Sequence, residues 1–179
     1  MSNPIVNFLL DSVRHYNHKK YWKKREEVIN PASKIPKFIR FIYMLQIKRM
    51  DTYHCSSMGT AFGYGTKFNS FPNLPHGLNG IIISHYAKIG TNCTIYQQVT
   101  IAESKDGKAA IIGDNCLIGA GAKIIGDVKI GKNVKIGANA VVLKDIPDNC
   151  TVVGVPAKVI KKDGVKVAEI ENNRQLVNS

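Results

Sequence analysis

The sequence predicts a mainly β fold, a triangular coil of hexapeptide repeats that follows a short N-terminal helical region. One observation is an apolar residue at every sixth position, in two runs separated by a single eleven-residue step: Ile83, Ile89, Ile95, Ile101, then Ile112, Ile118, Ile124, Ile130, Ile136 and Val142. A second is a small or β-branched residue four positions after most of them: Ala87, Cys93, Val99, Cys116, Ala122, Val128, Val134 and Ala140. A helix repeats near 3.6 residues and a simple strand at 2, so this period fits neither. It is typical of coils in which one hexad forms one side of a triangle and three hexads form a turn.

The pattern divides the chain into a helical region at residues 1–51, a β-helix domain at 52–162 and a tail at 163–179. The expected elements, in order, are helices at 5–29 and 38–49 separated by a break at 30–33, an imperfect opening coil at 52–82, the regular repeat at 83–147, a closing segment at 152–160 and a last strand at 165–170. The two helices are predicted from apolar residues spaced among basic ones, and Pro31 and Pro36 mark the break between them. The eleven-residue step adds five residues to one hexad, so residues 103–110 are expected to leave the coil as a loop.

Composition narrows the class of protein. The chain of 179 residues is 44% hydrophobic, which is ordinary for a globular protein. No run approaches the roughly 18 apolar residues of a membrane-spanning helix, and Ile5–Leu10 lacks the basic start and cleavage site of a signal peptide. We therefore expect a cytoplasmic protein. The four cysteines form no CxxC pair, and we expect Cys93 and Cys116 to be small buried residues that stay reduced.

The net charge of +12 favours an anionic partner, because such a field attracts nucleic acid, an anionic membrane or a phosphorylated small molecule. The sequence contains no nucleic-acid-binding module, so we expect no nucleic-acid partner and favour a nucleotide-bearing cofactor. A basic surface without a dedicated partner is the alternative. The basic, aromatic-rich second helix fits packing against the coil or a neighbouring subunit, or contact with a membrane surface.

Two of the five histidines are placed to do chemistry. His76 lies in a turn-rich stretch that enters the first regular hexad, and His85 is the third residue of its hexad. The third residue of the hexad one turn later is Glu103, so we expect His85 and Glu103 to stack beneath the loop as a general base oriented by a carboxylate. A surface turn histidine is the alternative. The other three carry less signal: we expect His15 and His18 to be solvated, and His54 is ambiguous. No histidine follows His85, so we expect no metal site.

Four motifs resemble the serine acetyltransferase branch of the hexapeptide-repeat acyltransferases. They are the segments 77–83 (GLNGIII), 95–101 (IYQQVTI), 118–126 (IGAGAKIIG) and 153–157 (VGVPA), and the resemblance covers about residues 70–160. It implies a left-handed parallel β-helix, which is an exception to the usual right-handed crossover. It also implies a homotrimer with active sites between subunits and acetyl-CoA as the donor.

The resemblance also implies roles for single residues. His76 matches the family's catalytic histidine, the general base, and His85 stands where the family often has an acidic residue near the site. Ala120 and Ala138 match the small residues over which the family lays pantetheine. Candidates for the CoA phosphates, chosen by charge, are Lys123, Lys135, Lys144 and Lys158. Candidates for contact with the acceptor are Asn79, Tyr96 and Gln97.

Two departures from the serine acetyltransferase pattern bear on the acceptor. Pro75 stands where the family has Asp, and Lys108-Ala109 stands where it has an Arg-His pair. We therefore expect an acetyl-CoA-dependent O-acetyltransferase that acts on a saccharide in surface polysaccharide synthesis, with peripheral contact to membrane-bound glycolipid intermediates. The alternatives are a serine O-acetyltransferase of cysteine biosynthesis and a non-catalytic trimeric scaffold.

Overall fold

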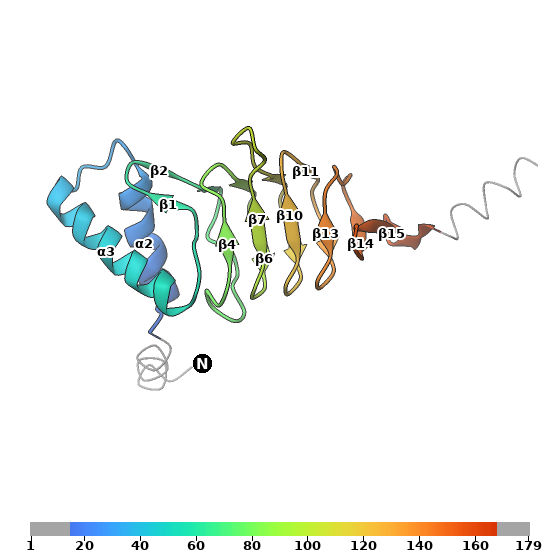
Figure 1. Cartoon of the computed structure of the whole chain (residues 1–179), viewed down its shortest axis with the longest axis horizontal. Coiled ribbons are helices and arrows are strands. Elements are labelled where there is room, and N and C mark those ends of the chain that lie inside the picture. Colours follow the sequence, from blue (N-terminus) through green and yellow to red (C-terminus); the bar gives the residue numbers. More distant parts are fainter. Residues whose placement is uncertain (1–14, 168–179) are drawn as a thin grey trace, which may run out of the picture.

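The computed structural model describes residues 15–167, which form a mainly β protein with two helices (Figure 1). The helices are α2 (His18–Ile29) and α3 (Lys37–Tyr53), and they lie together at one end of a row of short strands. The strands, in order, are β1 (Thr60–Ala61), β2 (Tyr64–Gly65), β3 (Lys67–Phe68), β4 (Ile82–Ile83), β5 (Lys88–Ile89), β6 (Thr94–Ile95), β7 (Thr100–Ala102), β8 (Ile111–Ile112), β9 (Leu117–Ile118), β10 (Lys123–Ile125), β11 (Lys129–Ile130), β12 (Lys135–Ile136), β13 (Val141–Val142), β14 (Cys150–Val153), β15 (Lys158–Lys162) and β16 (Val165–Lys166).

Most of these strands stack into three parallel sheets that the chain visits in rotation. The sheets have the orders β4-β7-β10-β13, β3-β5-β8-β11 and β6-β9-β12-β14, and β15 and β16 extend the third sheet in antiparallel fashion. Successive hexads therefore form the three sides of a coil, and each turn adds one strand to every sheet. The opening turn is complete, because bridges join Ser57 to Ile82 and Asn73 to Thr94 while β3 pairs with β5.

The apolar column of the repeat fills the interior of the coil. Its ten members, from Ile83 to Val142, are each at most 3% exposed, and the small-residue column beside it is buried as well. Each buried isoleucine contributes about 1.5–3 kcal/mol relative to an exposed one. Cys93 and Cys116 are buried in that second column as free thiols, as predicted. The period of six thus arises because one residue per side points inward at an equivalent place.

Asparagines occupy the tight turns along one edge of the coil. Asn92, Asn115, Asn133 and Asn149 each adopt a left-handed backbone with φ between 53° and 58°. Asparagine is one of the few residues other than glycine that tolerate this conformation. Their side chains also join the turns, since Asn92 donates to Asn115 (3.0 Å) and Asn133 donates to Asn149 (2.8 Å). Each tight corner is therefore specified locally, and two pairs of neighbouring corners are joined through their side chains.

A buried arginine fastens α2 to the opening turn. Arg25 donates to the Thr60 hydroxyl (3.1 Å) and to the backbone oxygens of Met58 (3.0 Å) and Thr66 (2.8 Å). Its guanidinium carbon also lies 5.3 Å from the ring centre of Trp22. A buried guanidinium requires several acceptors, and this one obtains them from the segment that leads into the coil. The helical region is consequently held against the first turn.

A second arginine and a tyrosine join α3 to α2. Arg40 donates to the backbone oxygens of Glu27, Val28 and Asn30, which satisfies carbonyls at the end of α2. The Tyr21 hydroxyl donates to Asp51 at 2.7 Å. On the opposite side of α3, Phe38, Phe41 and Leu45 are 73%, 54% and 54% exposed. The aromatic stripe of this helix thus faces away from α2.

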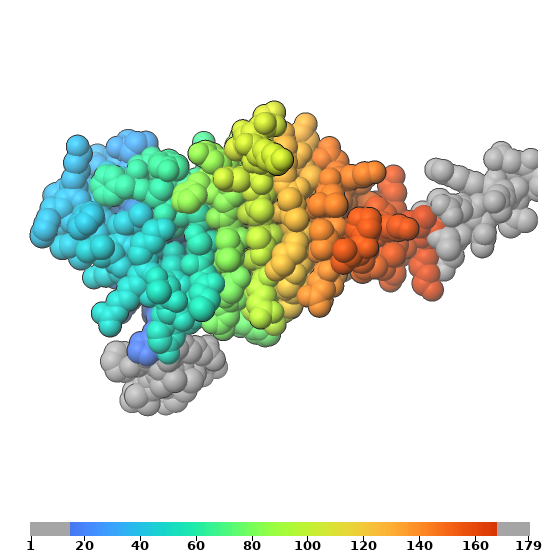
Figure 2. Space-filling view, in the orientation of Figure 1, coloured from blue at the N-terminus to red at the C-terminus, as the bar shows by residue number. Residues whose placement is uncertain are grey.

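Several boundaries differ from those expected. The second helix continues through Tyr53, and the part of the first helix expected at 5–14 lies outside the described residues. The loop that leaves the coil spans 103–108, because Ala109 and Ala110 are buried. It forms the yellow-green projection at the top of Figure 2. The segment 152–160 is split between β14 and β15, which form an antiparallel pair, and of the strand expected at 165–170 the structure shows β16.

Candidate active site

The segment 74–80 forms a turn that projects from one edge of the coil. Two glycines with left-handed backbones, Gly77 (φ 67°) and Gly80 (φ 65°), allow it to bend twice. The Gly77 amide donates to the Leu74 carbonyl (3.0 Å), and the Gly80 amide donates to the carbonyl of His54 (2.9 Å). The result is an exposed His76 side chain at the edge where β6, β9 and β12 lead into the next sheet.

The imidazole of His76 is oriented by an amide from the next turn. His76 Nδ1 lies 2.7 Å from Gln97 Oε1, and the Tyr96 ring meets the imidazole edge-on at 5.8 Å. An amide oxygen only accepts, so Nδ1 carries the proton and Nε2 has a free lone pair. This is the tautomer that a general base requires. The structure therefore brings His76, Tyr96 and Gln97 together, as expected for one site.

Asn79, a candidate for contact with the acceptor, has its side chain directed into the protein's own hydrogen bonds. Its Nδ2 donates to the His76 carbonyl (3.0 Å), its Oδ1 lies 2.8 Å from His54 Nδ1, and its own carbonyl accepts from the Gln98 amide (2.9 Å). Both polar atoms of the side chain are thus bonded within the protein. Asn79 is therefore suited to holding the turn in place, whereas direct contact with an acceptor stays a prediction.

The two alanines of the expected pantetheine site lie on the edge that carries His76. The Gly121 amide donates to the Gln97 carbonyl (2.9 Å), and the Asn139 amide donates to the Ala120 carbonyl (2.8 Å). Ala120 and Ala138 therefore follow Gln97 on successive turns, at the strand spacing of about 4.8 Å. Ala138 is exposed and Ala120 half-buried. This edge offers an extended ligand a path that starts beside His76.

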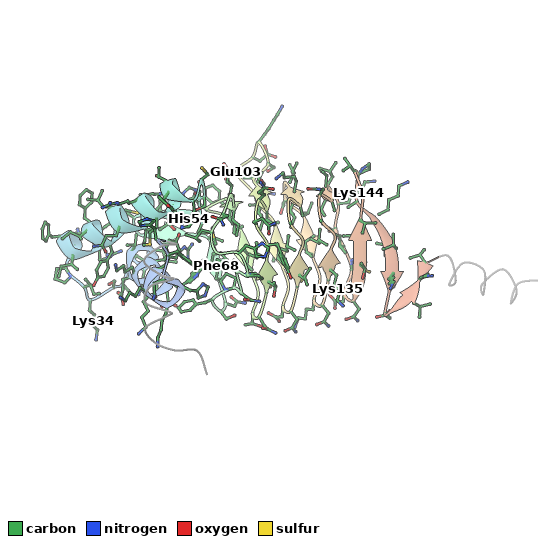
Figure 3. The ribbon with its side chains drawn as sticks, turned by 90° about the horizontal axis from the view of Figure 1, so that it is seen from below. Lys34, His54, Phe68, Glu103, Lys135 and Lys144 are labelled. Atoms are coloured by element: carbon green, nitrogen blue, oxygen red, sulfur yellow. The ribbon has the colours of Figure 1, made fainter. Side chains whose placement is uncertain are left out.

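The four lysines are not gathered at this edge. Lys123 Nζ donates to the Gln98 carbonyl at 2.8 Å, close to the alanines, and Lys158 begins β15, directly after the segment whose Ala157 amide donates to Val141. Lys135 lies on the sheet that leads into the edge, and Lys144 follows β13 on another side of the coil (Figure 3). Lys123 and Lys158 are thus the better placed pair for a phosphate group near this edge.

His85 and Glu103 lie on the next edge of the coil. The pairing of Ile83 with Ile101 puts them one turn apart, as expected. Glu103 accepts from the Ser84 hydroxyl at 2.6 Å, however, and the His85 ring lies 5.7 Å from that of Tyr64. Within residues 15–167 no hydrogen bond joins His85 to Glu103. The expectation that Glu103 orients His85 was wrong. The Glu103 carboxylate bonds to Ser84 instead, and the His85 ring contacts Tyr64 of the β1–β2 hairpin.

A cleft of about 660 Å³ lies beside His76. The helical region contributes Tyr16, His18, Tyr53 and His54, and the turn contributes residues 73–77 and Asn79. No carboxylate, lysine or arginine is among these lining residues. Burial raises the pKa of Tyr16 and lowers the pKa of His18, so both stay neutral near pH 7. The sequence alone did not predict that helical residues line this cleft, because the spacing of the repeat carries no information about which of them reach the turn.

Residues 15–167 contain neither a candidate metal site nor a candidate membrane-spanning helix. No group of three His, Cys, Asp or Glu side chains among them is arranged to hold a metal ion. In the same part of the chain, no helix is long and apolar enough to cross a membrane.

Comparison with known proteins identifies the relatives of this chain. The family model for bacterial transferase hexapeptide (six repeats) matches residues 109–144. A serine acetyltransferase of Staphylococcus aureus (strain Mu50) is 44% identical over 115 residues, which are 63% of this chain and 54% of the relative. A serine acetyltransferase of Staphylococcus epidermidis (strain ATCC 12228) is 36% identical over 148 residues, 81% of this chain and 68% of the relative. The chain thus spans about half the length of the S. aureus relative.

Solved structures agree with these relatives. The Neisseria gonorrhoeae serine acetyltransferase in complex with serine has a TM-score of 0.57 and 31% identity, covering 70% of this chain and 49% of that one. The Brucella abortus strain S19 serine acetyltransferase in complex with coenzyme A has a TM-score of 0.60 and 29% identity, covering 70% and 50%. These findings favour the serine acetyltransferase alternative over the polysaccharide branch. The chain belongs to the serine acetyltransferase family of hexapeptide-repeat transferases.

Proposed function

We propose that the protein is an acetyl-CoA-dependent O-acetyltransferase with serine as its acceptor. The observation that carries the proposal is His76, oriented by Gln97 with a free Nε2, on the edge that also presents Ala120 and Ala138. The names of its relatives support this activity, and among its structural neighbours one binds coenzyme A and another binds serine. The cytoplasm, which holds acetyl-CoA, is the expected compartment.

In the proposed reaction His76 acts as general base. Nε2 takes the proton of the acceptor hydroxyl while its oxygen attacks the thioester carbonyl. The C–O bond forms and the C–S bond breaks, and the proton then passes from His76 to the leaving thiolate. A positioned base of this kind contributes roughly 10²–10⁴ in rate. The same edge would hold the pantetheine arm over Ala120 and Ala138, with Lys123 and Lys158 toward the phosphates.

A saccharide is the second candidate acceptor, and the lining of the cleft favours it. Serine carries an ammonium and a carboxylate, which ordinarily require charged partners. The residues around the cleft include Tyr16, Tyr53 and the amides of Asn73 and Asn79, which suit the faces and hydroxyls of a sugar ring. Ala109, at the position of the family's loop histidine, is 6% exposed, and Lys108 lies 3.5 Å from Asp127. The expected loop contacts to an amino acid are therefore replaced.

The assembly and the handedness of the coil belong to the same proposal. We expect a left-handed coil and a homotrimer in which neighbouring subunits complete each site, on the strength of family membership. Peripheral contact with a membrane-bound glycolipid belongs to the saccharide alternative, and the exposed stripe of α3 is the surface where we would expect it. A trimer without catalytic activity is the remaining alternative.

Thiol release from acetyl-CoA by the purified protein tests these proposals. The acceptors are L-serine and, separately, a panel of sugars and nucleotide sugars. Release with serine, reduced at least about 100-fold in His76→Ala, would support the main proposal. Release with a sugar alone would support the second candidate. Failure to bind acetyl-CoA would favour the scaffold, and full activity of His76→Ala would show that another residue is the base.

A further inference from the structure

His54, labelled in Figure 3, lies between the helices and the coil, and its hydrogen bonds connect the helical region to the turn that carries His76. It follows α3 directly, and its carbonyl accepts from the Gly80 amide at 2.9 Å. Its Nδ1 lies 2.8 Å from Asn79 Oδ1. Asn79 Nδ2 in turn donates to the His76 carbonyl at 3.0 Å. A continuous chain of three hydrogen-bonded residues thus runs from the end of the helix to the backbone of the proposed base.

The chemistry of the three groups sets the direction of these bonds. The His76 carbonyl can only accept, so the amide nitrogen of Asn79 faces it and the amide oxygen faces His54. His54 must then carry its proton on Nδ1. Its Nε2 is buried and has no hydrogen-bond partner among the described residues. The rings of Tyr16 and Tyr53 lie 5.9 Å and 5.2 Å from the His54 ring. A buried Nε2 is poorly placed to take a proton from a substrate.

The turn is otherwise held by backbone hydrogen bonds at Gly77, Asn79 and Gly80 and by two buried leucines. Leu74 and Leu78 are buried, whereas Pro75, His76 and Asn79 are exposed, and the glycines at 77 and 80 add conformational freedom. The imidazole of His76 can stay against Gln97 only while its backbone stays in place. The bonds through Asn79 supply that restraint from outside the coil.

We propose that His54 is a positioning residue, which acts through Asn79 to hold His76 against Gln97 with Nε2 open to the cleft. This role rests on the proposed function of His76 and does not depend on which acceptor is used. It assigns to the helical region a direct part in the site, beyond packing against the first turn.

Kinetics of His54→Ala, Asn79→Ala and the double variant test this role, with Thr52→Ala as the control, since Thr52 is an exposed neighbour on α3. We expect each single change to lower kcat about 3- to 10-fold, as for loss of one exposed hydrogen bond, with the KM for acetyl-CoA unchanged. The double variant should lose no more than either single one, because both changes break the same chain. His54→Gln, whose amide can donate to Asn79, should recover part of the activity. The acid limb of the pH–rate profile should stay in place.

Hydrogen exchange gives a readout that needs no turnover. Amides of residues 74–80 should exchange faster in His54→Ala and Asn79→Ala than in the wild type and Thr52→Ala, and acetyl-CoA binding should show that the variants are folded. If the wild type transfers acetyl to no acceptor, the proposed function fails while exchange still decides the positioning role. The proposal would be overturned if His54→Ala had the same kcat and the same amide exchange rates as the wild type. Multiplicative losses in the double variant, or loss of the acid limb in His54→Ala, would also overturn it.

Discussion

At the residue scale, the proposed base is oriented by a neutral partner. Gln97 accepts from His76 at 2.7 Å and comes from the neighbouring turn, so its place is set by the coil itself. A carboxylate in the same position would orient the ring and also stabilise the imidazolium. The amide orients the ring without adding charge. Replacing Gln97 by an apolar residue or by a carboxylate should therefore affect catalysis in different ways.

We expect Gln97→Leu to lower kcat about 10- to 100-fold, because leucine cannot accept from Nδ1 and the ring loses its orientation. The matched variant Gln97→Glu keeps an acceptor and adds a negative charge. It should retain activity and move the acid limb of kcat/KM to higher pH, since the charge favours protonated His76. The measurement is a pH–rate profile for each variant. Unchanged kcat in Gln97→Leu would contradict the orienting role.

Asp51 is a buried carboxylate, and one of its oxygens has no hydrogen-bond partner within residues 15–167. Burial raises its pKa from 3.8 to about 6, although the Tyr21 hydroxyl, Lys48, Arg25 and His54 each act to lower it. Between about pH 4 and pH 6 the folded state binds this proton and the unfolded state does not. The free energy of unfolding should therefore fall as pH rises through this window, by at most about 3 kcal/mol.

Asp51→Asn should remove this dependence, because an amide oxygen still accepts from Tyr21 and carries no charge. We expect the variant to be more stable than the wild type by about 1–3 kcal/mol at pH 7.5 and similar to it near pH 4. Urea unfolding at both pH values, at one protein concentration, checks this expectation. Equal pH dependence in the two proteins would mean that Asp51 does not titrate in this range.

At the element scale, one edge of the coil carries all the groups proposed to act in transfer. Each hexad ends at one of three edges, so residues 18 apart in a regular run stack on the same edge. Ala120 and Ala138 have this spacing and continue the line that Gln97 begins. The edge is open because small residues stand where larger side chains would cover the backbone.

Ala138→Leu should obstruct this path. Since Ala138 is exposed, the substitution leaves the interior untouched, and we expect the KM for acetyl-CoA to rise about tenfold or more with little change in thermal stability. Ala32→Leu, at an exposed alanine between α2 and α3, is the control for an added apolar side chain. Titration calorimetry and steady-state kinetics measure the effect. If Ala138→Leu left the KM unchanged, acetyl-CoA would not bind along this edge.

At the scale of the whole molecule, the outer faces of the coil are not uniformly polar. Ile125 and Leu143 are 42% and 52% exposed, and they lie beside each other because Ile124 pairs with Val142. Exposed apolar pairs of this kind are suited to contact between subunits. They therefore agree with the proposed trimer.

Sedimentation equilibrium should give a particle of about three times the chain mass of 19.7 kDa. We expect Leu143→Asp to weaken this assembly, since a charge would be buried at the contact. Val165→Asp, at an exposed residue of β16, should leave it intact. A monomer at micromolar concentration would contradict the trimer and any site shared between subunits.

The repeat of the sequence was sufficient to predict the coil and the edge on which each candidate within residues 83–147 lies. The reason is local: a strict period of six sends the same hexad position inward or to an edge on every side, whatever its neighbours are. The period places Ala120 and Ala138 one turn apart on one edge, and the resemblance of the surrounding motifs to a known family indicated a shared site with His76 and Gln97.

Tertiary structure alone decided which side chains meet. Glu103 accepts from Ser84, and His54 and Tyr16 join the site of His76 from the helical region. Such partners depend on rotamers and on where a separate segment docks, and the repeat constrains neither. Arg25 secures that docking through four hydrogen bonds to residues far along the chain, and no periodic signal in the sequence marks them.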